Sequence, residues 1–150
     1  MEVKIDNAQL KAVSRRLDKF SKNVANKSIM NHMALVVKNK ILLRTNSGVD
    51  VNKKPFEDYN ADYADEKGKT IVNLTDTVEM LNSITQKALS STKAKVFFTS
   101  KEQATKALRH NNGIGNLPKR FFFGVNEKDE SDLVGDYQKA VNKAIKEFKQ

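Results

Sequence analysis

The sequence predicts an α+β fold, in which a small, mostly antiparallel sheet is packed against N-terminal helices and a C-terminal helix. Apolar residues recur at helical spacing between positions 10 and 41, and again between positions 133 and 148. Short strand-like segments bounded by turn residues lie between these two regions. The 150 residues are the size of one ordinary domain, so we expect a single domain over residues 1–150.

The N-terminal residues predict a short strand and then a helix. Val3 and Ile5 alternate with polar residues, as in a strand. Asp6 or Asn7 can cap the helix that follows, because both side chains accept hydrogen bonds from free backbone N–H groups. This helix carries one narrow apolar stripe, formed by Leu10, Val13, Leu17, Phe20 and Val24.

A second helix is expected from about Asn26 to the polar turn at 46–48. Its apolar row is Met30, Ala34, Val37 and Ile41, with Ile29, Met33 and Val36 beside it. Residues 46–70 then form a long polar loop, in which Pro55 breaks any helix. Aromatic residues recur at helical spacing after the proline and predict a short aromatic helix; they are Phe56, Tyr59 and Tyr63.

The centre of the chain predicts a helix, a hairpin and another helix. Asp76 and Glu79 have the spacing of a capping box. Ser90 and Thr92 lie between two strand-like runs, as in a hairpin loop. The expected elements are a helix starting near Val78, strands at 84–89 and 95–99, and a helix at 101–109.

The segment from His110 to Asp129 combines a glycine loop with an aromatic run. Gly113 and Gly115 permit positive φ, and Pro118 disfavours helix just before it. Phe121, Phe122 and Phe123 are of strand type and predict a third strand, closed by Gly124. Such an apolar run needs cover on both faces, from the domain's own core or from a neighbouring subunit. Asp129 to Asp132 open the last helix, whose apolar face is Leu133, Tyr137, Ala140, Val141, Ala144, Ile145 and Phe148.

Charge is distributed unevenly over the chain. The net charge is +9, of which residues 1–45 carry +7, from ten Lys/Arg and three Asp/Glu, and residues 46–150 carry +2. This pattern is typical of a solvated lysine-rich helix face, or of a surface that meets nucleic acid or an acidic partner. No aromatic residues are interleaved for base stacking, so only non-specific phosphate attraction is expected, with these DNA-channel candidates: Lys11, Arg15, Arg16 and Lys19.

No residue pattern indicates catalysis, a metal or a cofactor. The chain has no Cys, which excludes disulfides and thiolate sites and fits a reducing compartment. Gly113 and Gly115 lack the later glycine of a dinucleotide fingerprint.

His110 has no nucleophile in a recognised arrangement, so a loop-positioning hydrogen bond is its expected role; the alternative is a small hydrolase or toxin using His110 and the acidic loop. That loop holds Asp58, Asp62, Asp65 and Glu66, without the order of an EF-hand. We expect no signal peptide and no membrane span.

The order of short motifs between residues 35 and 135 resembles one known family. Arg44, Gly48 and Asp50 follow the pattern R-x-x-x-G-x-D, and the aromatic loop comes next. The block L-T-D-T-x-x-M-L-x-S at 74–83 precedes the hairpin, and His110, Gly113, Pro118 and R-F-F-F-G at 120–124 precede the last helix. This series resembles the virion morphogenesis (tail completion) family of tailed phages, including Mu-like prophages. Val78 stands where a Gly is usual and Phe123 where Leu is common.

The resemblance implies a structural protein of the head–tail junction: a tail completion, neck or tail terminator protein. Such proteins assemble as rings, often of six copies, around the DNA channel, and they are not enzymes. The implied partners are copies of the chain itself and other phage neck, tail-tube or head–tail adaptor proteins, with non-specific contact to genomic DNA and no membrane. The implied location is the virion, assembled in the host cytoplasm. The alternative is a small basic nucleic-acid-binding module.

Under this interpretation the matched residues shape loops or contact neighbouring subunits. The loop-shaping residues are His110, Gly113, Pro118 and Gly124. The subunit-contact candidates are Arg44, Asp50, Phe56, Tyr59, Tyr63, Arg120, Phe121, Phe122 and Phe123. Arg120 is expected to pair with an acid across a subunit boundary.

Overall fold

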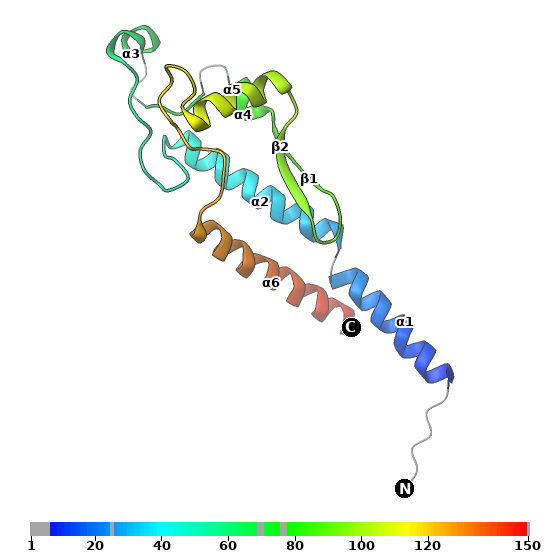
Figure 1. Ribbon diagram of the computed structural model, residues 1–150. Coiled ribbons are helices and arrows are strands. Elements are labelled where there is room, and N and C mark those ends of the chain that lie inside the picture. The colour runs from blue at the N-terminus through cyan, green and yellow to red at the C-terminus, as the bar shows by residue number, and fades with distance from the viewer. Residues whose placement is uncertain (1–6, 25, 69–70, 76–77, 150) are drawn as a thin grey trace.

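The computed structural model describes the whole chain except residues 1–6, 25, 69–70, 76–77 and 150 (Figure 1). The expected strand at Val3–Ile5 and the capping residue Asp76 lie outside the described residues. The elements, in chain order, are α1 (Asn7–Val24), α2 (Lys27–Asn46), α3 (Ala61–Lys67), α4 (Glu79–Asn82), β1 (Ile84–Ala88), β2 (Ala94–Phe98), α5 (Lys101–Asn112) and α6 (Glu127–Lys149).

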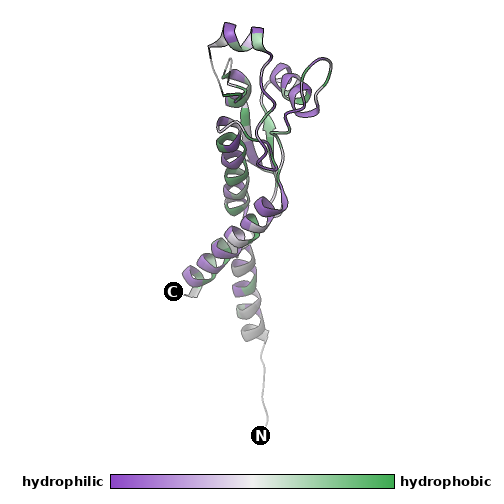
Figure 2. Ribbon diagram, turned by 90° about the vertical axis from the view of Figure 1, so that its left-hand side faces the viewer, coloured by the Kyte–Doolittle hydropathy of each residue, from purple (hydrophilic) through white to green (hydrophobic). Residues whose placement is uncertain are grey.

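The sheet is one antiparallel hairpin packed on helices, which confirms the α+β fold class. β1 and β2 pair from Ile84 opposite Phe98 to Ala88 opposite Ala94. Helix α2 packs along this hairpin and α6 packs against α2 (Figure 1). Helix α1 extends away from the rest of the molecule in both views and contacts α6 (Figures 1 and 2).

Helix α2 follows the sequence prediction closely. The Asn26 side chain accepts a hydrogen bond of 2.8 Å from the Ile29 backbone nitrogen, which satisfies a free donor of the first turn. The helix ends at Asn46, and Gly48 then adopts a φ of +74°. Apolar residues gather along α2 and the hairpin in Figure 2.

The core draws on the segment that the sequence predicted as a polar loop. Val51 and Phe56 are buried, and Phe56 joins the main apolar cluster. The backbone nitrogen of Phe56 donates to the carbonyl of Gly48 at 2.8 Å, so this residue is extended rather than helical. The short helix α3 begins only after Asn60, whose side chain caps it. Thus the prediction that Phe56 and Tyr59 lie on that helix is wrong.

The prediction of a third strand at Phe121–Phe123 is also wrong. The Phe122 nitrogen donates to the Arg120 carbonyl at 2.8 Å, which makes a tight turn in place of an extended ladder. The Phe121 carbonyl accepts from Val51 at 2.8 Å, and the Phe123 nitrogen donates to the Asn111 side chain at 2.9 Å. The backbone groups of the run are therefore satisfied by a local turn and by two separate segments, and the side chain of Phe122 fills the core.

The remaining helices match with shifted ends. Helix α4 starts at Glu79 after Val78, which has a φ of +55° and makes no side-chain cap. Helix α5 runs on to Asn112, beyond the expected end at Arg109. Helix α6 starts at Glu127, earlier than expected, because Asn126 and not Asp129 precedes its first turn.

Candidate functional sites

The motif residue Arg44 and the helix-opening Asp129 form a largely buried ion pair that ties α2 to the start of α6. The Arg44 Nη1 atom lies 2.6 Å from the Asp129 Oδ2 atom, and their side chains are 11% and 12% exposed. The Arg44 Nη2 atom donates to the carbonyls of Phe122 and Gly124. We call these four groups the Arg44 clasp. Arg44, a candidate for subunit contact, is thus engaged inside its own chain.

Asp129 also caps α6. The Asn126 side chain accepts from the Asp129 nitrogen at 2.8 Å, and the Asp129 carboxylate accepts from the Asn126 nitrogen at 3.3 Å, which is a reciprocal capping box. Burial acts to raise the pKa of Asp129, but the Asn126 N–H, the Arg44 guanidinium and the Lys40 ammonium outweigh it and lower that pKa. Hydrogen bonds from Lys128 and Lys40 lower the pKa of Asp132 to about 2.

Asp50 and Gly48 shape the turn after α2. The Asp50 carboxylate accepts from the backbone nitrogens of Asn52 and Lys54 at 2.8 Å each. A Cβ atom on Gly48 would lie 3.0 Å from the carbonyl oxygen of Val72. The R-x-x-x-G-x-D pattern therefore has a structural role here. Arg44 forms the clasp, Gly48 lets two backbone segments come close, and the Asp50 carboxylate holds the turn.

The aromatic run is largely covered by the chain's own core. Phe122 is 0% exposed, and Phe121 and Phe123 are half-buried. The rings of Phe98 and Phe123 have centroids 4.9 Å apart. At Gly124, a Cβ atom would lie 3.0 Å from the Phe121 ring, so glycine permits this packing.

The glycine loop behaves as predicted. Gly113 ends α5 with a φ of +67°, and Gly115 has a φ of +75°. A Cβ atom on Gly113 would lie 2.9 Å from the Lys119 nitrogen, because the loop folds back on the end of the helix. The His110 carbonyl accepts from the Arg120 nitrogen at 2.8 Å, which fixes the return of that loop past Pro118.

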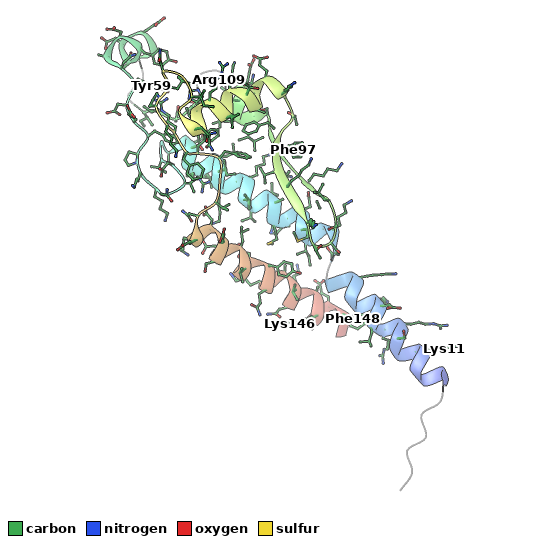
Figure 3. All side chains as sticks on the ribbon, viewed as in Figure 1. Lys11, Tyr59, Phe97, Arg109, Lys146 and Phe148 are labelled. Atoms are coloured by element: carbon green, nitrogen blue, oxygen red, sulfur yellow. The ribbon has the colours of Figure 1, made fainter. Side chains whose placement is uncertain are left out.

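A pocket of about 640 Å³ lies beside this loop. Arg120 is 3% exposed, donates from Nη2 to the Glu57 carbonyl at 3.1 Å, and lies 5.3 Å from the centre of the Tyr59 ring. The Tyr59 and Tyr63 rings meet edge to face at 4.9 Å. Side chains from α5 complete the lining, and Figure 3 labels Tyr59 and, on α5, Arg109, which does not line the pocket. The lining residues include Glu57, Asp58, Leu74, Met80, Lys106, His110, Leu117 and Pro118.

An apolar groove of about 530 Å³ runs between α2, β2 and α6. Its lining includes Val134, which is 65% exposed, and the partly exposed Val125 and Tyr137. The α2 wall is Met30, Met33, Ala34, Val37 and Ile41. This groove was not predicted from the sequence, although the two adjacent apolar rows on α2 are more than a single packing seam needs.

A basic end is formed where α1 contacts α6. Residues 7–27 carry six Lys/Arg and one Asp, and residues 137–149 carry four Lys and one Glu. These two ranges, which we call the basic end, therefore hold +8 of the net +9. The channel candidates Lys11, Arg15, Arg16 and Lys19 are all exposed on α1, and Figure 3 marks Lys11 on this helix and Lys146 on α6.

The described residues hold no group of three His, Asp or Glu side chains placed to share a metal ion. Nor does this part of the chain contain a helix long and apolar enough to cross a bilayer. No protein-family model matches the chain, and comparison with curated proteins and with solved structures found no significant match.

Proposed function

We propose that this chain is a structural component of a tailed-phage virion at the head–tail junction. In this role it is a tail completion, neck or tail terminator protein that forms a ring, of six copies, around the DNA channel. Its partners are then copies of itself and adjoining neck, tail-tube or adaptor proteins.

The observation that carries this proposal is the apolar groove. Val134, Val125 and Tyr137 leave apolar surface in water at a concave site between three elements. Soluble monomers rarely leave a large continuous apolar patch uncovered, because covering it releases about 25 cal/mol per Å². A chain that functions inside an assembly has a partner to cover such a groove.

The motif series supports the same role. Two of its motifs meet: Arg44 donates to the Phe122 and Gly124 carbonyls of the R-F-F-F-G run, and Val51, next to Asp50, donates to the Phe121 carbonyl. These bonds and the Arg44–Asp129 pair join α2, the 46–60 segment and the start of α6. A precise junction of this kind suits a building block whose contact faces must keep a fixed angle, since a head-to-tail contact closes into a ring only at a fixed rotation.

The groove can be tested by placing a charge in it. Val134→Asp changes an exposed side chain, so the fold should persist while self-association falls at least tenfold in light scattering and ring images disappear. Leu108→Asp is the matched control, because Leu108 is 54% exposed on α5 and does not line the groove. Unchanged association of the Val134 variant, or equal loss in the control, would contradict the proposed contact face.

The basic end supports a second candidate function, a small nucleic-acid-binding module. The fold unites two basic segments that are separated by more than a hundred residues, so one surface concentrates the charge. Phosphate attraction of this type weakens steeply as salt rises. The test is a gel-shift assay of duplex DNA with the lone subunit at low salt. A shift that the combined Lys11→Glu, Arg15→Glu and Lys19→Glu substitutions abolish would support the nucleic-acid-binding function. Absence of any shift at low salt removes it, while ring formation can still be measured.

A further inference from the structure

The buried Arg120 and the partly buried Arg44 differ in one respect. Arg44 pairs with the Asp129 carboxylate at 2.6 Å. Arg120 is buried more deeply, yet it makes no ion pair with any described carboxylate within 4.0 Å. Its guanidinium contacts the Glu57 carbonyl and the face of the Tyr59 ring, and the Nε atom is buried with no hydrogen-bond partner.

A buried arginine without a carboxylate partner carries a positive charge that no nearby negative charge fully neutralises. A guanidinium stays charged in proteins, so burial cannot be relieved by loss of its proton. Burial lowers the pKa of Arg120, while the nearby Tyr59, Glu57 and Tyr63 offset only part of that effect. Buried charges are ordinarily paired, because removing an ion from water without a partner is costly.

The surroundings of Arg120 provide room for the missing anion. The guanidinium borders the 640 Å³ pocket, a size in the range of small-ligand sites. One side of that pocket is apolar, from Leu117, Pro118 and the Tyr63 ring, and Lys106 brings a second cation on α5. Lys106 is half exposed, and its ammonium lies 3.7 Å from the Glu102 carboxylate of its own helix, which partly neutralises its charge.

We propose that this pocket binds a carboxylate, which pairs with the Arg120 guanidinium while its carbon chain lies against the tyrosine rings. The charges favour a carboxylate over a phosphate. Glu57 and Asp58 also line the pocket and repel any anion, and this repulsion is weaker for a singly charged carboxylate than for a doubly charged phosphate. The planar fork of a guanidinium matches a carboxylate geometrically. Two sources share this chemistry: an acidic side chain of a second copy, and a free small carboxylic acid.

The test is a titration of the intact, isotope-labelled protein at constant ionic strength, followed through the arginine Nε–Hε signals and the backbone amide signals. The probe is N-acetylglutamic acid α-amide, and its uncharged counterpart is N-acetylglutaminamide. We expect the acid to shift the Arg120 and Tyr59 signals saturably, and the amide to leave them unchanged. Equal shifts with both probes, or no saturable shift, would overturn the proposal. So would stronger binding of inorganic phosphate than of the acid.

Variants separate the pocket from general surface charge. Arg120→Gln should weaken acid binding at least tenfold, and Arg109→Gln, on the exposed face of α5, should leave it within twofold. Because Arg120→Gln removes a buried residue, Arg120→Lys is tested alongside it. Lysine keeps the positive charge but lacks the planar guanidinium, so this variant should also bind the acid at least tenfold more weakly. Unchanged signals from the β-hairpin show that it is still folded. Glu57→Gln should tighten binding, since it removes a negative charge at the pocket. Binding that Arg109→Gln weakens as much as Arg120→Gln contradicts the assignment.

A final arm distinguishes the two sources. If the carboxylate belongs to a second copy, the acid probe should dissociate self-associated protein and Arg120→Gln should weaken self-association. If it is a free acid, binding of the probe persists and self-association does not change with either. The titration itself uses unassembled protein, so it succeeds or fails independently of the proposed ring.

Discussion

Neutralising Asp129 tests how much the Arg44 clasp stabilises the fold. The substitution Asp129→Asn removes the negative charge but keeps an oxygen that can still accept hydrogen bonds from Arg44 and Asn126. Breaking a buried ion pair from one side ordinarily costs about 3–5 kcal/mol. Arg44 and Asp129 are each about one-tenth exposed, and the retained carbonyl contacts and amide oxygen recover part of the loss. We therefore expect the free energy of unfolding to fall by about 2 kcal/mol.

Urea denaturation followed by circular dichroism measures this change. For a slope of about 2 kcal/mol per molar urea, the midpoint should fall by about 1 M. A double-mutant cycle with Arg44→Gln should return a coupling energy of about 1–2 kcal/mol between the two residues. The matched control is Asp136→Asn, which breaks an exposed contact of 3.6 Å to Lys139 and should cost about 0.5 kcal/mol or less. A loss at Asp129 no larger than at Asp136, or a coupling energy near zero, would refute the reasoning.

Three further outcomes follow from the structure. The folded chain lowers the pKa of Asp129 below the ordinary 3.8 and that of Asp132 to about 2. At a pH above 3.8 both ionised carboxylates therefore stabilise the fold, and this stabilisation is lost as the pH falls and they are protonated. Unfolding stability should therefore drop between about pH 4 and pH 2, and the Asp129→Asn/Asp132→Asn variant should lose less over that interval; identical acid curves would contradict this. Gly113→Ala should lower the melting temperature more than Gly115→Ala, because both have positive φ but only the first would place Cβ 2.9 Å from facing backbone; equal shifts would argue against the clash. Phe122→Ala, at a fully buried site, should cost about 4 kcal/mol in urea denaturation, and a cost below that of a surface substitution would show that the core is misassigned.

Features that depend on near neighbours in the chain could be predicted from the order of residues. The start of a helix near Asn26, the hairpin loop between the strands and the positive φ of Gly113 all follow from local backbone chemistry. The helical stripes likewise predicted α1, α2 and α6 and hence the α+β class. The aromatic run at 121–123 has a composition typical of a strand, but the prediction of a strand was wrong. Its backbone bonds the Val51 backbone and the Asn111 side chain in place of a neighbouring strand.

Contacts between distant groups depend on the packing of the whole chain and could not be predicted from the order of residues. The Arg44–Asp129 pair spans 85 residues, and nothing in the spacing of either residue identifies the other as its partner. The same packing joined two basic segments into one end, opened the apolar groove beside Val134, and buried Arg120 without a carboxylate. These features depend on how helices and loops pack across the whole chain, since burial and long-range electrostatics are set by three-dimensional neighbours and not by sequence neighbours.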